Sequence, residues 1–284
     1  MECLNDLWQQ KSAQEHDRVS EHKSTGMIGD KLTFRWWQLI CAISVGNVVL
    51  WSLAAWGLLW DSDVYRYKQL ALSGLFVAAC AFRSFLPRVD LERICLWDVS
   101  LSSIILGRTV ATIAELCFAG QCVLLLFRLS DLTGSSVLGG IGVAVLPIVI
   151  VAELACWFAI TTLNHIWHAV EELLWSIIVC LMAAGLVLYW RHTAGVTPIL
   201  VPIGLLACAG TAVLIWAVDI PLYIARWRRG KRSGLHYLRI SEGLKDALVR
   251  RWATQRRNDW RSEVLWMSLY FSAGVWVSLG MIFV

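Results

Sequence analysis

Two imidazoles and two carboxylates occur together in residues 161–175, TTLNHIWHAVEELLW, between long apolar stretches. On a helix, His168 and Glu172 lie one turn apart and His165 lies two turns from Glu172, so the three share a face. Imidazole nitrogens and carboxylate oxygens bind zinc and iron, and they also relay protons. We therefore predict a metal or proton-relay cluster, with zinc or iron as the candidate metal, formed by His165, His168, Glu171 and Glu172.

Further charged residues interrupt the apolar segments on either side of this cluster. Glu115 lies two helical turns from Arg108, and Glu153 repeats the Ala-Glu-Leu context of Glu115. An ionisable side chain at bilayer depth costs about 2.5–3.5 kcal/mol, so each one is expected to have a partner or a function. We predict that Glu115 and Glu153 are catalytic acid–base groups or metal ligands. The residues predicted to bind substrate are Arg88, Arg108, Asn164 and Asp219.

Structural roles and transport would use the same residues. Arg108 paired with Glu115 or Glu153 would fix helix packing, and Glu171 and Glu172 in a first helical turn would stabilise the helix dipole. Buried carboxylates also suit the uptake of a coupling proton, as in a carrier. The segment FRSFLPRVDLERICLWD (82–98) adds three arginines that, together with Arg108, form a candidate bidentate site for a phospholipid or prenyl phosphate head group.

The composition is that of a membrane protein. The chain has 284 residues, of which 58% are hydrophobic and 16% are charged, whereas soluble domains are about a quarter charged. A spanning helix needs roughly 20 apolar residues. We therefore expect an all-α, polytopic transmembrane bundle of about seven spans, at 37–60, 67–86, 99–127, 137–163, 170–190, 196–222 and 263–284.

The loop charges predict the orientation of the bundle. With seven spans, 20 Lys and Arg residues fall on the side of the N-terminus and 4 on the other side. The positive-inside rule therefore places the N-terminus inside the cell, in a plasma or inner membrane. The nine cysteines fall mostly within the predicted spans, which is typical of buried thiols and not of a disulfide framework.

The apolar stretches and the loop charges divide the chain into four parts. Residues 1–35 form a polar cytoplasmic leader, 36–225 the first six spans, 226–262 a basic cytoplasmic segment and 263–284 the last span. The basic segment places Leu244 and Leu248 at helical spacing, which predicts an amphipathic helix drawn to anionic inner-leaflet lipid. This membrane-bound position argues against nucleic acid as a partner.

In the seven-span topology, Arg108, Glu115, Glu153 and the 165–172 cluster fall in the inner half of the bilayer. We predict that they line one polar cavity. The leading hypothesis is a membrane-embedded enzyme that takes a lipid or other amphiphilic small molecule from the cytoplasmic leaflet. A proton- or ion-coupled transporter is the alternative, and a non-catalytic partner subunit is the third. The sequence does not indicate an oligomeric state.

Several other classes are excluded by missing motifs. The last predicted span has no Lys for a retinal Schiff base, and the chain has no GxxxxGK[ST], HExxH or GxSxG motif.

Overall fold

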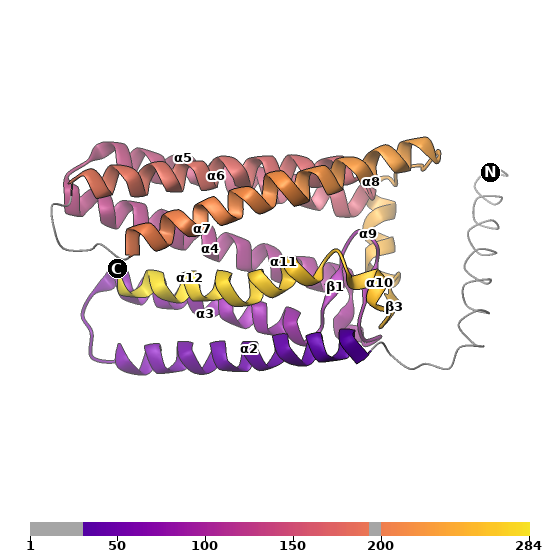
Figure 1. Cartoon of the computed structure of the whole chain (residues 1–284), viewed down its shortest axis with the longest axis horizontal. Helices are drawn as coiled ribbons and strands as arrows, with labels where there is room; N and C mark the ends of the chain where they lie inside the picture. The colour runs from indigo at the N-terminus through magenta and orange to yellow at the C-terminus, as the bar shows by residue number, and fades with distance from the viewer. Residues whose placement is uncertain (1–30, 193–199) are drawn as a thin grey trace.

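The computed structural model describes residues 31–192 and 200–284, and these form a bundle of long helices (Figure 1). The chain runs back and forth along the bundle in α2 (Lys31–Gly57), α3 (Val64–Phe85), α4 (Ile104–Thr133), α5 (Ser136–Thr162) and α6 (His165–His192). It crosses again in α7 (Leu200–Leu214), a π-helical segment η2 (Ile215–Asp219) and α8 (Ile220–Arg232). The last crossing consists of α11 (Val264–Leu269), the π-helical η3 (Tyr270–Gly274), α12 (Val275–Gly280) and the short 3-10 turn η4 (Met281–Phe283). The all-α, polytopic architecture expected from the sequence is therefore confirmed.

The number of spans is lower than predicted. Six helices of the described chain are long and apolar enough to cross a membrane, and α3 is the crossing helix that does not reach this level of apolarity. Its 22 residues extend about 33 Å at the usual helical rise, so its length is sufficient. α3 is less apolar than the other crossing helices because it carries four strongly polar residues: Arg66, Lys68, Gln69 and Arg83.

Short elements close one end of the bundle, which we call the α9 end. They are a hairpin of β1 (Arg88–Val89) and β2 (Ile94–Cys95), a 3-10 turn η1 (Ser100–Ser102), α9 (Ile240–Val249), β3 (Trp252–Ala253) and α10 (Arg257–Trp260). β1 pairs antiparallel with β2, and β3 adds to β2 in parallel, with Ile94 opposite Trp252. In Figure 1 these elements lie on the right, and the C-terminus lies at the opposite end.

Helix α9 is held against the end of α5 by close packing. Gly243 faces the backbone of Thr161 so closely that an added Cβ would overlap its carbonyl oxygen. Arg93 ties the two elements to the hairpin, because its Nε donates to Asp246 at 2.9 Å and its Nη2 donates to the carbonyl of Ile160. Leu244 and Leu248 are exposed, as expected for a helix with an apolar outer face.

The predicted parts map onto this bundle with shifted borders. Of the predicted leader (1–35), residues 1–30 lie outside the described residues and the last five belong to α2, and the start of the sixth predicted span also lies outside them. The helix of that span continues through α8 to Arg232, so the predicted border at 225/226 falls inside a helix. Connections rich in Lys and Arg meet at the α9 end, and the side of the membrane that this end faces stays a prediction.

Tight connections between the helices have clear local causes. Gly134 ends α4 in the left-handed region with φ 67°, which only glycine adopts freely. Leu163 takes the same region at the end of α5, and Asn164 Oδ1 then accepts a hydrogen bond from the backbone N–H of Ile166 in the first turn of α6. These two turns align α4, α5 and α6 side by side.

Candidate functional site

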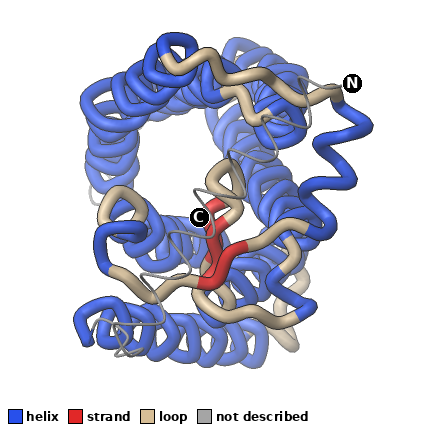
Figure 2. Tube along the Cα trace, turned by 90° about the vertical axis from the view of Figure 1, so that its right-hand side faces the viewer, coloured by secondary structure: helices blue, strands red, loops and turns tan. Residues whose placement is uncertain are grey.

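A cavity of about 1170 Å³ lies inside the bundle. Figure 2 looks along the bundle, so that its long helices are seen end-on. The walls of the cavity change in character along its length. At the α9 end the wall carries charged and polar side chains, namely Arg83, Arg88, Asp90, Glu92, Arg108, Glu115, His168, Glu171, Glu172, Tyr223, Arg226 and Glu263. Towards the opposite end it is apolar, with Leu125, Leu129, Met182, Leu186, Val201 and Met281.

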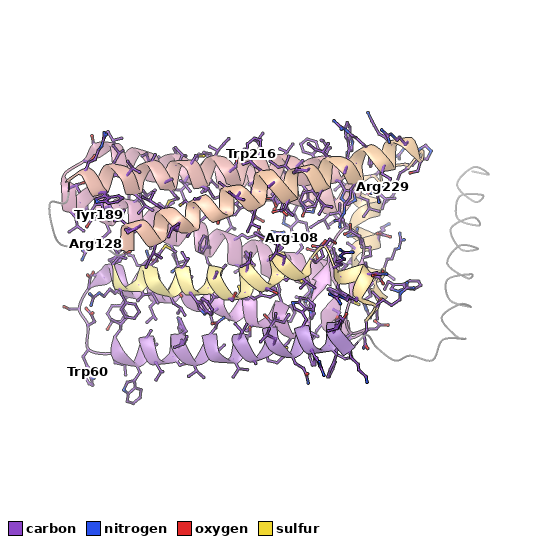
Figure 3. All side chains as sticks on the ribbon, viewed as in Figure 1. Trp60, Arg108, Arg128, Tyr189, Trp216 and Arg229 are labelled. Carbon is purple, nitrogen blue, oxygen red and sulfur yellow. The ribbon has the colours of Figure 1, made fainter. Side chains whose placement is uncertain are left out.

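Arg108 binds two carboxylates from two helices. Its Nη2 donates to Glu115 Oε2 at 2.5 Å on the same helix and to Glu153 Oε2 at 3.0 Å on α5. Arg108 and Glu153 are buried, and Figure 3 places Arg108 inside the bundle. The structure therefore forms both of the ion pairs that the sequence offered as alternatives.

Thr112 completes this group, which we call the arginine cluster (Arg108, Thr112, Glu115 and Glu153). Its hydroxyl donates to Glu153 Oε2 at 2.7 Å and accepts from Arg108 Nε at 3.2 Å and from Trp157 Nε1 at 3.1 Å. A hydroxyl has one donor and two acceptor positions, so all three are used. The second oxygen of Glu153, Oε1, is buried and has no hydrogen-bond partner within the described chain.

His168 and Glu171 form a hydrogen-bonded dyad in the first turn of α6. His168 Nδ1 lies 2.5 Å from Glu171 Oε2, and both side chains line the cavity. A carboxylate on Nδ1 fixes the imidazole tautomer and leaves Nε2 to accept or deliver a proton. The dyad can therefore act as a general base or acid at the cavity wall.

The thiol of Cys156 lies behind this dyad. Its Sγ is 3.8 Å from His168 Nδ1, and ligand atoms of Cys156, His168 and Glu171 all lie within 4.8 Å of one another. These ligand types suit zinc, but a structural zinc site takes four ligands, and here the His168–Glu171 hydrogen bond already engages two of the three. Bound zinc or iron stays a prediction.

A second ion-pair group lines the cavity at the α9 end. Arg226 on α8 contacts Glu92 of the hairpin at 2.9 Å and Glu263, which precedes α11, at 3.3 Å. One helical turn away, Tyr223 stacks on His168 with ring centroids 4.9 Å apart. Burial raises the pKa of the Glu92 carboxyl, while the charge of Arg226 acts to lower it. Arg226 thus joins three separate segments around the dyad.

Arg88 is a buried cation with unused donors. Its Nη1 donates to the carbonyl oxygens of Ser103 at 2.7 Å and Leu101 at 3.3 Å, while Nε and Nη2 are buried without a partner among the described residues. The side chain is 1% exposed, and burial lowers its pKa to about 10, which leaves it charged at neutral pH. Arg83 lines the same wall with no carboxylate within 4.0 Å in the described chain.

The predicted site residues thus divide into two groups. The cavity brings together Arg88, Arg108, Glu115, His168, Glu171 and Glu172, with Glu153 directly behind Arg108. Three others do not appear in its wall: Asn164 caps α6, Asp219 lies buried in η2, and His165 stacks on Tyr223 at 6.4 Å. The functional roles predicted for both groups stay predictions.

Five charged or polar members of the wall were not predicted as site residues from the sequence: Asp90, Glu92, Tyr223, Arg226 and Glu263. Arg226 begins the basic segment that was expected to lie against anionic lipid. Its partner Glu92 lies far away in the chain, so the sequence did not indicate their contact. A signal was present, since Tyr223 and Arg226 are spaced three residues apart and so share the inner face of a helix.

Comparisons with known proteins give no relative from which a role can be transferred. No protein-family model, no curated protein and no solved structure matches the chain. The assignment of a function therefore rests on the cavity and its side chains.

Proposed function

We propose that the protein is a membrane-embedded enzyme that acts on the head group of a long-chain amphiphile. The observation that supports this most directly is the division of one cavity into a charged end and an apolar body. A molecule with a polar head and a hydrocarbon chain matches this division. The cavity volume of about 1170 Å³ also exceeds the roughly 300–1,000 Å³ of ordinary small-molecule pockets.

The length of the cavity fits a lipid chain. Arg108 and Leu129 on α4 both line it, as do His168 and Tyr189 on α6. Each pair is separated by about 30 Å along its helix, which is close to the thickness of the hydrocarbon core of a bilayer. A bound chain would therefore lie along the bundle, parallel to the lipids outside.

The His168–Glu171 dyad is the best-placed acid–base group for the reaction. Glu171 holds His168, and Tyr223 packs against the ring, so the imidazole has one orientation. A positioned general base of this kind contributes about 10²–10⁴-fold to a rate. Glu115 and Glu153 are engaged by Arg108, which favours a role in holding that cation at the cavity wall.

Two irregular helices border the cavity and support a functional role for it. Residues of η2 and η3 both line it, and π-helical segments are frequent at functional sites. In α7–α8, Pro221 lies two residues after the end of η2 and cannot donate a backbone hydrogen bond, which accounts for the irregularity there.

The test is lipid turnover by the full chain. The protein is reconstituted into vesicles of phosphatidylethanolamine and phosphatidylglycerol, supplied with a protein-free extract of soluble metabolites, and new lipid species are followed by mass spectrometry. We expect a product from the wild type and a loss of about 100-fold or more for His168→Asn. His236→Asn, at an exposed histidine outside the cavity, is the matched control. Equal turnover by His168→Asn and the wild type would overturn the proposal.

The two π-helical segments also favour a second candidate, a carrier for an amphiphile. π-Helical segments inside long helices are frequent at functional sites, and η2 carries the buried carboxylate of Asp219. A carrier would require sealed vesicles and an ion or proton gradient, whereas the enzyme would work in detergent.

A further inference from the structure

We propose that Arg88, supported by Arg83, binds a phosphate group at the charged end of the cavity. This inference rests on the proposed function in one respect, since the phosphate would be the head group of the amphiphile. The residues of this phosphate site differ from those of the arginine site that the sequence predicted. Of the four predicted arginines, Arg93 and Arg108 are held in ion pairs with protein carboxylates, so Arg83 and Arg88 are the two without a carboxylate partner in the described chain.

The unused donors of Arg88 have the geometry of an oxyanion fork. Nε and Nη2 lie on one edge of the guanidinium, and that edge makes the two parallel hydrogen bonds of bidentate Arg–phosphate and Arg–carboxylate pairs. The other nitrogen, Nη1, is anchored by the carbonyls of Ser103 and Leu101. The side chain is therefore fixed, buried and missing two partners.

The acidic groups of the same wall select among anions. Glu92 is neutralised by Arg226, and Glu171 is bonded to His168. Asp90 also lines the cavity, and its Oδ1 is buried without a partner in the described part of the chain. A hydrogenphosphate group offers acceptor oxygens to Arg88 together with an O–H donor for Asp90.

Gly107 offers a way to displace Arg88 without changing charge. The Arg88 side chain lies directly against Gly107, and an added Cβ would overlap its Cδ, Nε and Nη1 atoms. Gly46, on α2, has no atom within 4 Å of the corresponding position. Gly107→Ala and Gly46→Ala thus make the same chemical change in a membrane helix, and only the first moves the fork.

The experiment measures binding to the purified full chain in dodecyl maltoside by isothermal titration. The probes are dodecyl phosphate, inorganic phosphate and dodecyltrimethylammonium. We expect dodecyl phosphate to bind most tightly, and inorganic phosphate to compete weakly at the same site. Arg88→Gln should weaken dodecyl phosphate binding about tenfold or more, because two charge-assisted hydrogen bonds are lost. Gly107→Ala should weaken it several-fold, while Gly46→Ala and Arg229→Gln remain within about twofold of the wild type.

The phosphate site and the proposed enzymatic function fail on different results. Binding of dodecyl phosphate that is unchanged in both Arg88→Gln and Gly107→Ala would overturn the phosphate site, as would tighter binding of the cationic probe. The proposed function would still stand if His168 is needed for turnover. Should Arg88→Gln fail to fold, as judged by size-exclusion chromatography, Arg88→Lys and Gly107→Ala decide the question, because both keep the positive charge.

Discussion

Two buried polar groups of this bundle differ in a way that separates packing from function. One is the arginine cluster, on the α9 side of the bundle. The other, the glutamine cluster, consists of Gln69, Ser73, Gln121 and Ser278, nearer the opposite end, and all four side chains are fully buried. Both clusters join side chains from different helices, so burial and connectivity alone do not distinguish them.

The glutamine cluster is neutral and nearly closed. Gln121 Nε2 donates to the carbonyls of Gln69 and Ser278, and Ser278 Oγ lies 2.6 Å from Gln121 Oε1 and 3.0 Å from Ser73 Oγ. None of the four residues lines the cavity, and one of their side-chain atoms, Gln69 Oε1, lacks a partner within the described residues. This cluster fixes the packing of α3, α4 and the last helix.

The arginine cluster, by contrast, is charged and borders the cavity. Arg108 and Glu115 line the wall, and unpartnered atoms of Glu153, Arg88 and Asp90 lie at the same end. Buried charges without partners cost far more than buried amides with partners. The unpartnered atoms of Glu153, Arg88 and Asp90 do not stabilise the fold, which is why we propose a ligand at this end of the cavity.

The largest expected effect is the loss of the Arg108 charge. Arg108→Leu leaves Glu115 and Glu153 buried together without their cation, and we expect a loss of about 3–5 kcal/mol in the free energy of unfolding. Denaturation in detergent, followed by Trp fluorescence, measures this loss. Arg128→Leu, on the same helix, removes a partly exposed pair with Asp63 and should cost about 1 kcal/mol or less. Equal losses would show that the Arg108 pairs are no more important than surface pairs.

A methyl group at Gly243 should disturb the α9 end alone. Gly243→Ala forces α9 away from the carbonyl of Thr161, and we expect a loss of about 3 kcal/mol, because backbone cannot move aside as a side chain can. Hydrogen exchange should increase in α9 and the hairpin and stay unchanged near Gln121. At Gly230 the nearest contact is ordinary, so Gly230→Ala is the control. Increased exchange near Gln121 would mean that the two ends are not independent.

Removal of the Gln121 side-chain amide from the glutamine cluster should destabilise the fold and leave the turnover of the enzyme unchanged. Gln121→Leu strips partners from Ser278 and from two backbone carbonyls, and we expect a loss of about 2 kcal/mol in the free energy of unfolding. Turnover per folded molecule should remain that of the wild type. A large fall in turnover, with folding intact, would place the glutamine cluster in the functional machinery after all.

The smallest expected effect concerns the pH dependence of stability. Burial raises the pKa of Glu92 above its unfolded value, so its contribution to stability is present at low pH and is lost as the pH rises through the folded pKa. The wild type should therefore lose slightly more stability than Glu92→Gln between pH 5 and pH 8. Thermal unfolding scans at several pH values measure this difference. Steeper pH dependence in Glu92→Gln than in the wild type would contradict a raised pKa at Glu92.

Much of the architecture could be predicted from the sequence, because apolar length and loop charge act locally. The run of apolar residues in α4, α5 and α6 is sufficient to predict three spanning helices, and α9 falls within the predicted basic segment. The shared depth of Arg108, Glu115 and His168 followed from the alternation of chain direction. α3 crosses the bundle with the other helices, so the alternation holds, but its charged residues leave six of the described crossings apolar enough to be candidate spans.

The pairing of side chains could not be predicted in the same way. Arg108 had two carboxylates within reach, and only the packing of α4 on α5 brings Glu153 to the same nitrogen as Glu115. Arg226 contacts Glu92 across more than a hundred residues of chain, and no local pattern indicates such a contact. The hairpin of β1 and β2 was also missed, since two-residue strands have no detectable period.

The most direct test of an internal lipid site is to locate a bound chain inside the protein. A hexadecyl phosphate with a photoreactive diazirine at the end of its chain is incubated with the full chain in lipid vesicles, irradiated, and its sites of attachment are mapped by mass spectrometry. We predict attachment to cavity-lining residues of α6, from Trp175 to Leu186, and a loss of this labelling in Arg88→Gln. Labelling confined to exposed residues outside the cavity wall, such as Leu53, Ile150 and Leu154, would contradict the internal site.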